Sequence, residues 1–166
     1  MPDADSPLVI RRATDADWPA LWPIVAAVLA GGDTYALAPG TPEPEARAFW
    51  MGPGLTTYLA ELGGEVVGTY ALRANQPGLG AHVANAGYMV RPGHAGRGVG
   101  TALGEHSLAA RAAGYRAMQF NAVVSTNARA IALWERLGFA VVGTVPGAFR
   151  HRELGYVDVH IMHRFL

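Results

Sequence analysis

The sequence contains no cysteine among its 166 residues. This absence excludes disulfides, metal sites built on thiolates and a cysteine nucleophile. A chain without cysteine also suits a reducing compartment, so we expect a cytoplasmic protein.

Charge is scarce as well. Charged residues make up 16% of the chain, and thirteen basic residues balance thirteen acidic ones, which gives a formal net charge of zero. A chain without a global positive field does not attract nucleic acid or an anionic membrane over a distance. We therefore expect neither as a partner, and any anion that the protein binds must be held locally.

Long hydrophobic runs are missing too. The longest, residues 24–30, is far shorter than the roughly 20 residues that a membrane span needs. The first residues are acidic where a signal peptide would be basic. Hydrophobic residues nevertheless make up 51% of the chain. This is enough to pack a core, so we expect a soluble protein with one domain over residues 1–166.

The patterning of the chain predicts a mixed α/β fold. Segments of alternating and of helical periodicity follow one another in the order β-α-α-β-β-β-α-β-α-β-β. The Gly63–Gly64 pair predicts a hairpin turn. Thr41 is predicted to cap the second helix, and Gly114 and Gly138 are predicted to end the third and fourth.

Glycine, unlike cysteine, is plentiful, and it is concentrated in one segment. Five glycines lie between Gly93 and Gly104, where VRPGHAGRGVGTAL joins a predicted strand to a predicted helix. The first N–H groups of a helix lack intrahelical partners and carry partial positive charge, and bare glycine backbone lets a phosphate approach them. The segment therefore predicts an anion site; a tight turn that holds no ligand is the alternative.

Two common phosphate loops do not fit this segment. A Walker loop requires Gly-Lys-Ser/Thr where this chain has Gly98-Val99-Gly100. A dinucleotide-binding fingerprint requires a third Gly or Ala and belongs to the first β-α-β unit, whereas this loop lies in mid-chain.

The glycine segment resembles motif A of the GCN5-related N-acetyltransferases (GNAT) through Val90, Pro92 and residues 95–100, although Ala95 stands where that family usually has Gln or Arg. A second segment, STNARAIALWERLGF, resembles motif B of the same family. Together with the order of the elements, the resemblance covers essentially the whole chain. It implies the GNAT fold, a mostly antiparallel sheet whose fourth and fifth strands are parallel and splayed, flanked by four helices. The motif B matches are Asn127, Ala130, Ile131, Leu133, Gly138 and Phe139.

The resemblance implies acetyl-CoA as co-substrate. In the family, backbone N–H groups of motif A hold the pyrophosphate, and the pantetheine arm pairs with the fourth strand, here near Met89 and Val90. A backbone N–H, expected at Val90, faces the oxyanion. Asn127 either bonds the cofactor or serves only as a helix cap. The expected cofactor-binding residues are Met89, Val90, Ala95, Gly96, Arg97, Gly98, Val99, Gly100, Thr101, Asn127 and Trp134.

The sequence departs from the family at the residues that move protons. Trp134 stands where motif B usually has Tyr, whose hydroxyl is commonly assigned to protonating the leaving thiolate. A thiol of pKa about 8.5 leaves without much help, so the change should slow the reaction rather than prevent it. Trp134 either contacts the pantetheine end or is only a core aromatic. The fourth strand also lacks the carboxylate that many relatives use as a base, and His82 is expected to face away from Asn85.

Two asparagines extend the resemblance to one branch of the family. Asn85, in NAGYMV, and Asn121, in FNAVVSTN, resemble the branch that acetylates azetidine-2-carboxylate and related imino acids, in which asparagines bind the substrate. The alternative for Asn121 is a buried amide bonded to neighbouring backbone. A lining of uncharged amides suits a small zwitterion better than a polycation. Asp33 and Tyr35 are expected to shape the same pocket.

We therefore predict an N-acetyltransferase in which a small amino or imino acid attacks the acetyl-CoA thioester directly. The alternatives are acetylation of a phosphinothricin-like amino acid or another small amine, and a non-catalytic acyl-CoA-binding sensor. A homodimer is left open. No metal is expected, because the histidines are scattered and His160 and His163 fall on opposite faces of a predicted strand.

Overall fold

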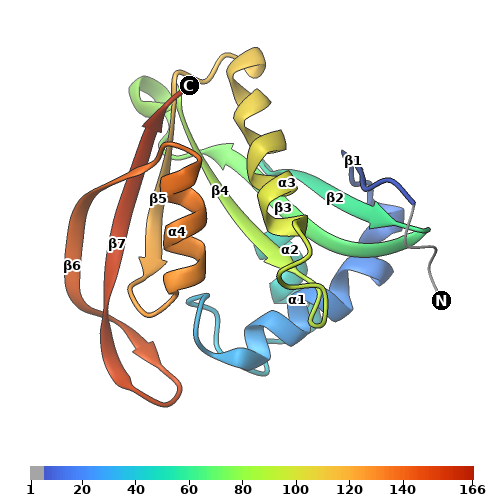
Figure 1. Ribbon diagram of the computed structural model, residues 1–166, viewed down its shortest axis with the longest axis horizontal. Helices are drawn as coiled ribbons and strands as arrows, with labels where there is room; N and C mark the ends of the chain where they lie inside the picture. The colour runs from blue at the N-terminus through green and yellow to red at the C-terminus, as the bar shows by residue number, and fades with distance from the viewer. Residues whose placement is uncertain (1–5) are drawn as a thin grey trace.

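The computed structural model describes residues 6–166, and within that range its elements follow the predicted order (Figure 1). The start of the chain, on which part of the argument against a signal peptide rests, lies outside this range. The strands are β1 (Val9–Arg12), β2 (Thr56–Leu62), β3 (Glu65–Ala74), β4 (Val83–Val90), β5 (Ala117–Val124), β6 (Ala140–His151) and β7 (Gly155–Phe165). The α-helices are α1 (Trp18–Gly31), α2 (Glu43–Met51), α3 (Val99–Ser107) and α4 (Ala128–Arg136).

The strands form one mixed sheet in the order β1-β2-β3-β4-β5-β7-β6. All neighbours are antiparallel except β4 and β5, which are parallel. These two pair only at Val83–Ala117 and Ala84–Met118 and then diverge. The expected splayed parallel pair is thereby confirmed, and from Ala86 onward β4 has a neighbouring strand on one side only.

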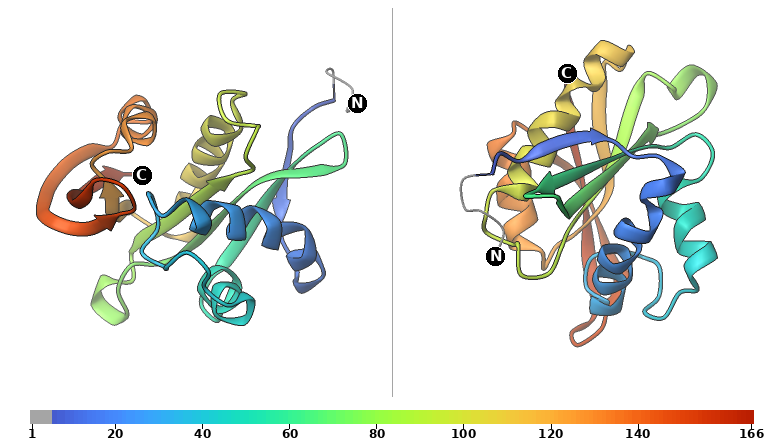
Figure 2. Two further views of the ribbon diagram at one scale, coloured as in Figure 1. Left: turned by 90° about the horizontal axis from the view of Figure 1, so that it is seen from below. Right: turned by 90° about the vertical axis from the view of Figure 1, so that its right-hand side faces the viewer.

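A hydrophobic core lies on each face of the sheet. α3 and α4 cover one face, and α1 and α2 cover the other (Figure 2). The register between β3 and β4 has no shift from Ala84 to Val90, so side chains alternate regularly along β4. Met89 packs into the core under α1 and α2, and Tyr88 packs against the other core. Asn85 shares the face of Met89.

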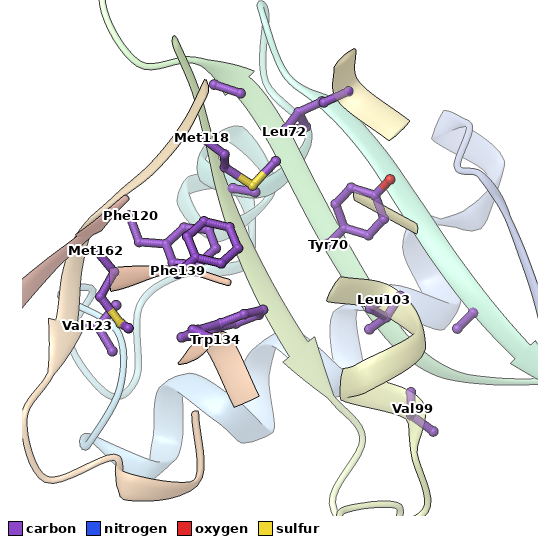
Figure 3. Close-up of a cluster of buried hydrophobic side chains, with 14 of the residues drawn as sticks. Tyr70, Leu72, Val99, Leu103, Met118, Phe120, Val123, Trp134, Phe139 and Met162 are labelled. Atoms are coloured by element: carbon purple, nitrogen blue, oxygen red, sulfur yellow. The ribbon is translucent and has the colours of Figure 1, made fainter. Parts of the chain in front are cut away.

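Aromatic side chains fill the space under α4 where β4 and β5 diverge (Figure 3). The ring centroid of Trp134 lies 4.5 Å from that of Tyr88 on β4 and 4.7 Å from that of Phe120 on β5. Phe139 stacks on Phe120 at 4.4 Å. Burial of one such ring contributes roughly 1.5–3 kcal/mol, so this cluster holds the two strands apart as a stable arrangement.

The predicted turns and helix ends are largely confirmed. Gly63 and Gly64 have φ of 57° and 81°, as the predicted hairpin turn requires, and Gly138 follows α4 with φ of 85°. The third helix differs from the prediction, because α3 ends at Ser107 and a 3-10 helix, Leu108–Ala113, continues to the left-handed Gly114. The capping prediction for α2 is wrong by one residue. Pro42 is the N-cap, and the Thr41 hydroxyl instead donates to the Ala38 carbonyl at 2.6 Å. No helix in residues 6–166 has the length and apolarity needed to cross a membrane.

Candidate active site

A pocket of about 720 Å³ lies where β4 and β5 diverge. Its lining divides into two parts by position. What we call the cofactor half is lined by Met89, Val90, Ala95, Asn127, Ala130 and Trp134. What we call the acceptor half is lined by Asp33, Thr34, Tyr35, Arg73, Asn85 and Asn121.

Every second residue of β4 offers its backbone to the pocket. The Arg91 N–H donates to the Val67 carbonyl at 2.8 Å, which places the odd-numbered residues of this strand in hydrogen-bonded pairs with β3. In an antiparallel pair, the intervening residues direct their N–H and C=O groups to the opposite side. The groups that face the diverging side are those of Ala86, Tyr88 and Val90.

This alternation separates two residues that the sequence analysis grouped together. The backbone of Val90 faces the pocket, as its proposed role requires. The backbone of Met89 is paired with Thr69 of β3, and its side chain is buried. Met89 can therefore contribute only side-chain contact to the pocket.

Tyr35 ties the loop after α1 to β4. Its hydroxyl donates to the Tyr88 carbonyl at 2.8 Å. Gly87 makes this contact possible, because a Cβ at position 87 would lie 3.0 Å from the Tyr35 hydroxyl oxygen. Burial raises the pKa of the Tyr35 phenol well above its ordinary value, so the hydroxyl stays neutral and remains a donor.

The glycine loop, which we call the cradle, leads into the start of α3. Gly93, Gly96 and Gly98 have φ between 80° and 87°, a region that favours glycine. Gly98 is the N-cap, and the first intrahelical bond runs from the Ala102 N–H to its carbonyl. The N–H groups left without an intrahelical acceptor are those of Val99, Gly100 and Thr101.

The space in front of this cradle is open. A Cβ at Gly98 would meet no atom within 4 Å, whereas a Cβ at Gly100 would point inward to Leu133 at 3.6 Å. The N–H of Gly100 can therefore face a ligand, but the absence of a side chain at this position adds no space for one. Arg129 of α4 brings a guanidinium nitrogen within 3.8 Å of the Cβ position of Gly96. Sequence reasoning missed Arg129, because only the fold places α4 beside this loop.

Asn127 and Trp134 have the structural roles weighed from the sequence and also line the pocket, while their contacts with a cofactor stay a prediction. The Asn127 Oδ1 accepts a hydrogen bond from the Ala130 N–H at 3.3 Å, so the capping role is confirmed, yet the side chain also lines the pocket. Trp134 is a buried core aromatic that lines the pocket too. The Tyr88 hydroxyl does not replace the missing acid. It is bonded to Ser107 at 2.7 Å, and burial raises the pKa of this phenol.

Asn85 and Asn121 reach the same pocket from neighbouring strands. The β5–β7 register shifts between Phe120 and Val123, so a bulge in β5 includes Asn121. Asn121 is exposed rather than buried, and the alternative reading of a buried amide is therefore wrong.

The Asn121 amide is oriented by two other side chains. Its Nδ2 donates to the Asn75 Oδ1 at 2.7 Å, and its Oδ1 accepts from the Gln119 Nε2 at 3.1 Å. Neither partner was identified from the sequence, because Asn75 follows β3 and meets Asn121 only through the fold.

The acceptor half is not the uncharged lining that the asparagines suggested. It contains one acid, Asp33, and one base, Arg73, and neither forms an ion pair within residues 6–166. The Thr34 hydroxyl is buried and has no hydrogen-bond partner among residues 6–166. His82 is exposed in the turn before β4 and does not line this pocket. Across the described residues, no three His, Cys, Asp or Glu side chains are grouped as a metal site would require.

A glycine cradle, an open strand edge and a pocket between splayed parallel strands define a protein of the acetyltransferase fold class. Residues 26–139 match the model of the acetyltransferase (GNAT) family. The chain belongs to this family.

Known relatives agree with this assignment. N-acetyltransferase aca1 of Schizosaccharomyces pombe is 35% identical over 111 residues, which are 66% of this chain and 53% of that protein. The chain thus matches about half the length of this curated relative. The solved structure of a GCN5-related N-acetyltransferase from Kribbella flavida has a TM-score of 0.90 and 48% identity, over 96% of this chain and 98% of the other. A phosphinothricin acetyltransferase from Sinorhizobium meliloti, solved with acetyl-CoA, has a TM-score of 0.79 and 26% identity, over 96% and 88%.

Proposed function

We propose that the chain is an acetyl-CoA-dependent N-acetyltransferase of small amino or imino acids, with azetidine-2-carboxylate and proline analogues as the first candidates. The observation that carries the proposal is one continuous pocket, which runs from the open edge of β4 to a polar acceptor half that contains Asn85 and Asn121. The names of the relatives support acetyl transfer to nitrogen, and one of them is a phosphinothricin acetyltransferase.

The residues of the cofactor half fit acetyl-CoA. The unpartnered N–H groups at the start of α3 suit its pyrophosphate, and Arg97 and Arg129 add positive charge beside them. Val90 offers an N–H and a C=O to the pantetheine amides, as an added strand would. The Nδ2 of Asn127 can donate a hydrogen bond to the same ligand. When bound, acetyl-CoA supplies the acetyl thioester.

We propose the N–H of Tyr88 as the oxyanion donor, in place of the N–H of Val90 expected from the sequence. An antiparallel strand rises about 3.4 Å per residue, so Val90 lies about 17 Å along β4 from Asn85, and Tyr88 about 10 Å. A small acceptor held beside Asn85 reaches the nearer residue more easily. The Tyr88 N–H also faces the pocket, and the Tyr35 hydroxyl fixes the orientation of the adjoining carbonyl. We assign this N–H to the thioester oxygen.

The chemistry then needs little more than placement. The acceptor nitrogen first loses one proton to water and then attacks the thioester carbon, so that the C–N bond forms and the C–S bond breaks. The nitrogen releases its second proton to water as the amide forms. The sulfur leaves as a thiolate, because a thiol of pKa about 8.5 is a good leaving group. Trp134 contributes packing and no proton.

The test is the release of free CoA thiol over a panel of amines. The panel contains azetidine-2-carboxylate, proline analogues, phosphinothricin, common amino acids and an aminoglycoside. We expect the imino acids to give the highest kcat/KM. A preference for phosphinothricin would select the alternative substrate, and acetyl-CoA binding without thiol release from any amine would identify a sensor. An aminoglycoside as the best acceptor would overturn the assignment.

We also propose that a second copy of this chain covers the β6 edge. β6 is an edge strand, and it exposes Val141, Val142 and Val145 by 41%, 62% and 43%. An unpaired edge can pair with its own copy about a two-fold axis. Sedimentation should show a dimer that Val142→Lys converts to a monomer. Leu79→Lys, at an isolated exposed position in a turn, is the control; equal effects of both variants would contradict the proposal.

A further inference from the structure

We propose that Arg73 holds the carboxylate of the acceptor and thereby selects amino and imino acids over simple amines. This inference rests on the proposed function and adds a specificity residue that the family motifs do not contain. Arg73 is the one arginine that lines the acceptor half within the described residues.

The sheet places Arg73 directly beside Asn85. The two residues are register partners across β3 and β4, and they fall in a hydrogen-bonded pair, whose Cα atoms lie about 5.5 Å apart. Paired residues present their side chains on the same face. Since Asn85 lies on the face covered by α1 and α2, the Arg73 side chain belongs to the same face.

Two further amides extend this group to β5. Asn75, two residues after Arg73, has its N–H bonded to the Val83 carbonyl at 2.8 Å, so it continues the pairing with β4. Its Oδ1 accepts from the Asn121 Nδ2, and its own Nδ2 makes no hydrogen bond in residues 6–166. The donors of three strands thus meet at the end of the pocket where β4 and β5 still pair.

The chemistry of this group matches a carboxylate. A guanidinium presents N–H donors in a planar fork that fits two carboxylate oxygens, and that of Arg73 has neither a hydrogen bond nor an ion pair in the described chain. Exposed on β3 and paired in register with Asn85, this arginine is free to donate to a small anion. Asp33, on the loop after α1, lines the same part of the pocket, and no ion pair joins it to Arg73 in residues 6–166. The acceptor half therefore has separate positive and negative groups, as a zwitterion requires.

The experiment compares two acceptors that differ only in the carboxylate: azetidine-2-carboxylate and azetidine-2-carboxamide. In the wild type, thiol release should give a higher kcat/KM with the acid. Arg73→Gln should lower kcat/KM for the acid by about 10- to 100-fold, mostly through KM, and change that for the carboxamide by less than about threefold. Arg73→Lys should retain part of the preference. Arg150→Gln, at an exposed position on β6, is the matched control and should behave as the wild type.

The outcomes separate this inference from the proposed function. An equal loss for both acceptors, or no loss in Arg73→Gln, would overturn the assignment of Arg73 while acetyl transfer stands. If the wild type shows no turnover, calorimetric titration measures the affinity of the acid for the protein with acetyl-CoA bound. Binding that weakens in Arg73→Gln without any thiol release would keep the carboxylate site and reject the enzyme. Absence of both binding and turnover would reject the two together.

Discussion

The two halves of the pocket present different kinds of groups to a ligand. The cofactor half borders the glycine loop, and the stretch between Val90 and Thr101 presents mostly main-chain groups. The acceptor half presents side chains from the loop after α1 and from β3, β4 and β5. The proposed main-chain recognition of the cofactor depends on backbone conformation, and under that proposal Ala95 can stand in place of the usual Gln or Arg. Side-chain recognition depends on the identity of each residue, so one substitution can change the acceptor without disturbing the cofactor.

The largest test of this contrast is Gly98→Val. A β-branched residue is strained at φ of 80°, and its side chain would occupy the open space in front of the cradle. We expect calorimetry to show acetyl-CoA affinity reduced at least about 100-fold. Gly64→Val, in the hairpin turn between β2 and β3, is the control, since Gly64 also has positive φ and open space. If both variants weaken binding equally, backbone strain and not the blocked cradle is the cause.

Asn121→Ala probes the other half. It removes one amide that is oriented by Asn75 and Gln119, and loss of one such hydrogen bond is worth about 1 kcal/mol. We expect about a five- to tenfold rise in KM for the acceptor, with acetyl-CoA affinity unchanged within twofold. Gln76→Ala, an exposed amide outside the pocket, serves as the control. If Asn121→Ala changed only the binding of acetyl-CoA, Asn121 would belong to the cofactor half and our assignment would be wrong.

Arg129→Ala measures the side-chain share of cofactor recognition. A partly solvated contact between a guanidinium and a phosphate contributes about 1 kcal/mol, and salt screens it. Acetyl-CoA affinity should fall about fivefold at low ionic strength and less at high. Arg136→Ala, at the end of the same helix, should have no effect. A loss that is independent of salt would point to altered folding of α4.

The smallest effect is expected for Trp134→Phe. Because the indole packs between Tyr88 and Phe120, phenylalanine keeps most of the contact, and kcat should stay within about threefold of the wild type. Steady-state rates and thermal unfolding would be measured together. A fall in kcat of about a thousandfold in a folded variant would exceed packing effects and show acid catalysis at this position.

The same contrast explains what the sequence could predict. The cradle lies within one segment, so its glycines, the start of α3 and the Asn127 cap followed from local pattern. Arg73 and Asn75 did not, since nothing near them in the chain marks a site, and the contact of Gln119 with Asn121 depends on the local bulge in β5. Their meeting depends on the pairing of Arg73 with Asn85 and on the bulge that includes Asn121. Arg129 was missed for the same reason, because the approach of α4 to the glycine loop is a tertiary contact.

The divergence of β4 from β5 has a consequence for the energetics of the whole protein. One side of β4 is unpaired although the strand lies in the middle of the sheet. The amides of Ala86, Tyr88 and Val90 therefore have no neighbouring strand to protect them from hydrogen exchange. A ligand that lies along β4 acts as the missing strand and binds only the folded chain. By mass action, it stabilises the native state in proportion to the logarithm of its concentration. The supply of the acyl donor would then raise the stability of the folded protein as well as its rate of turnover.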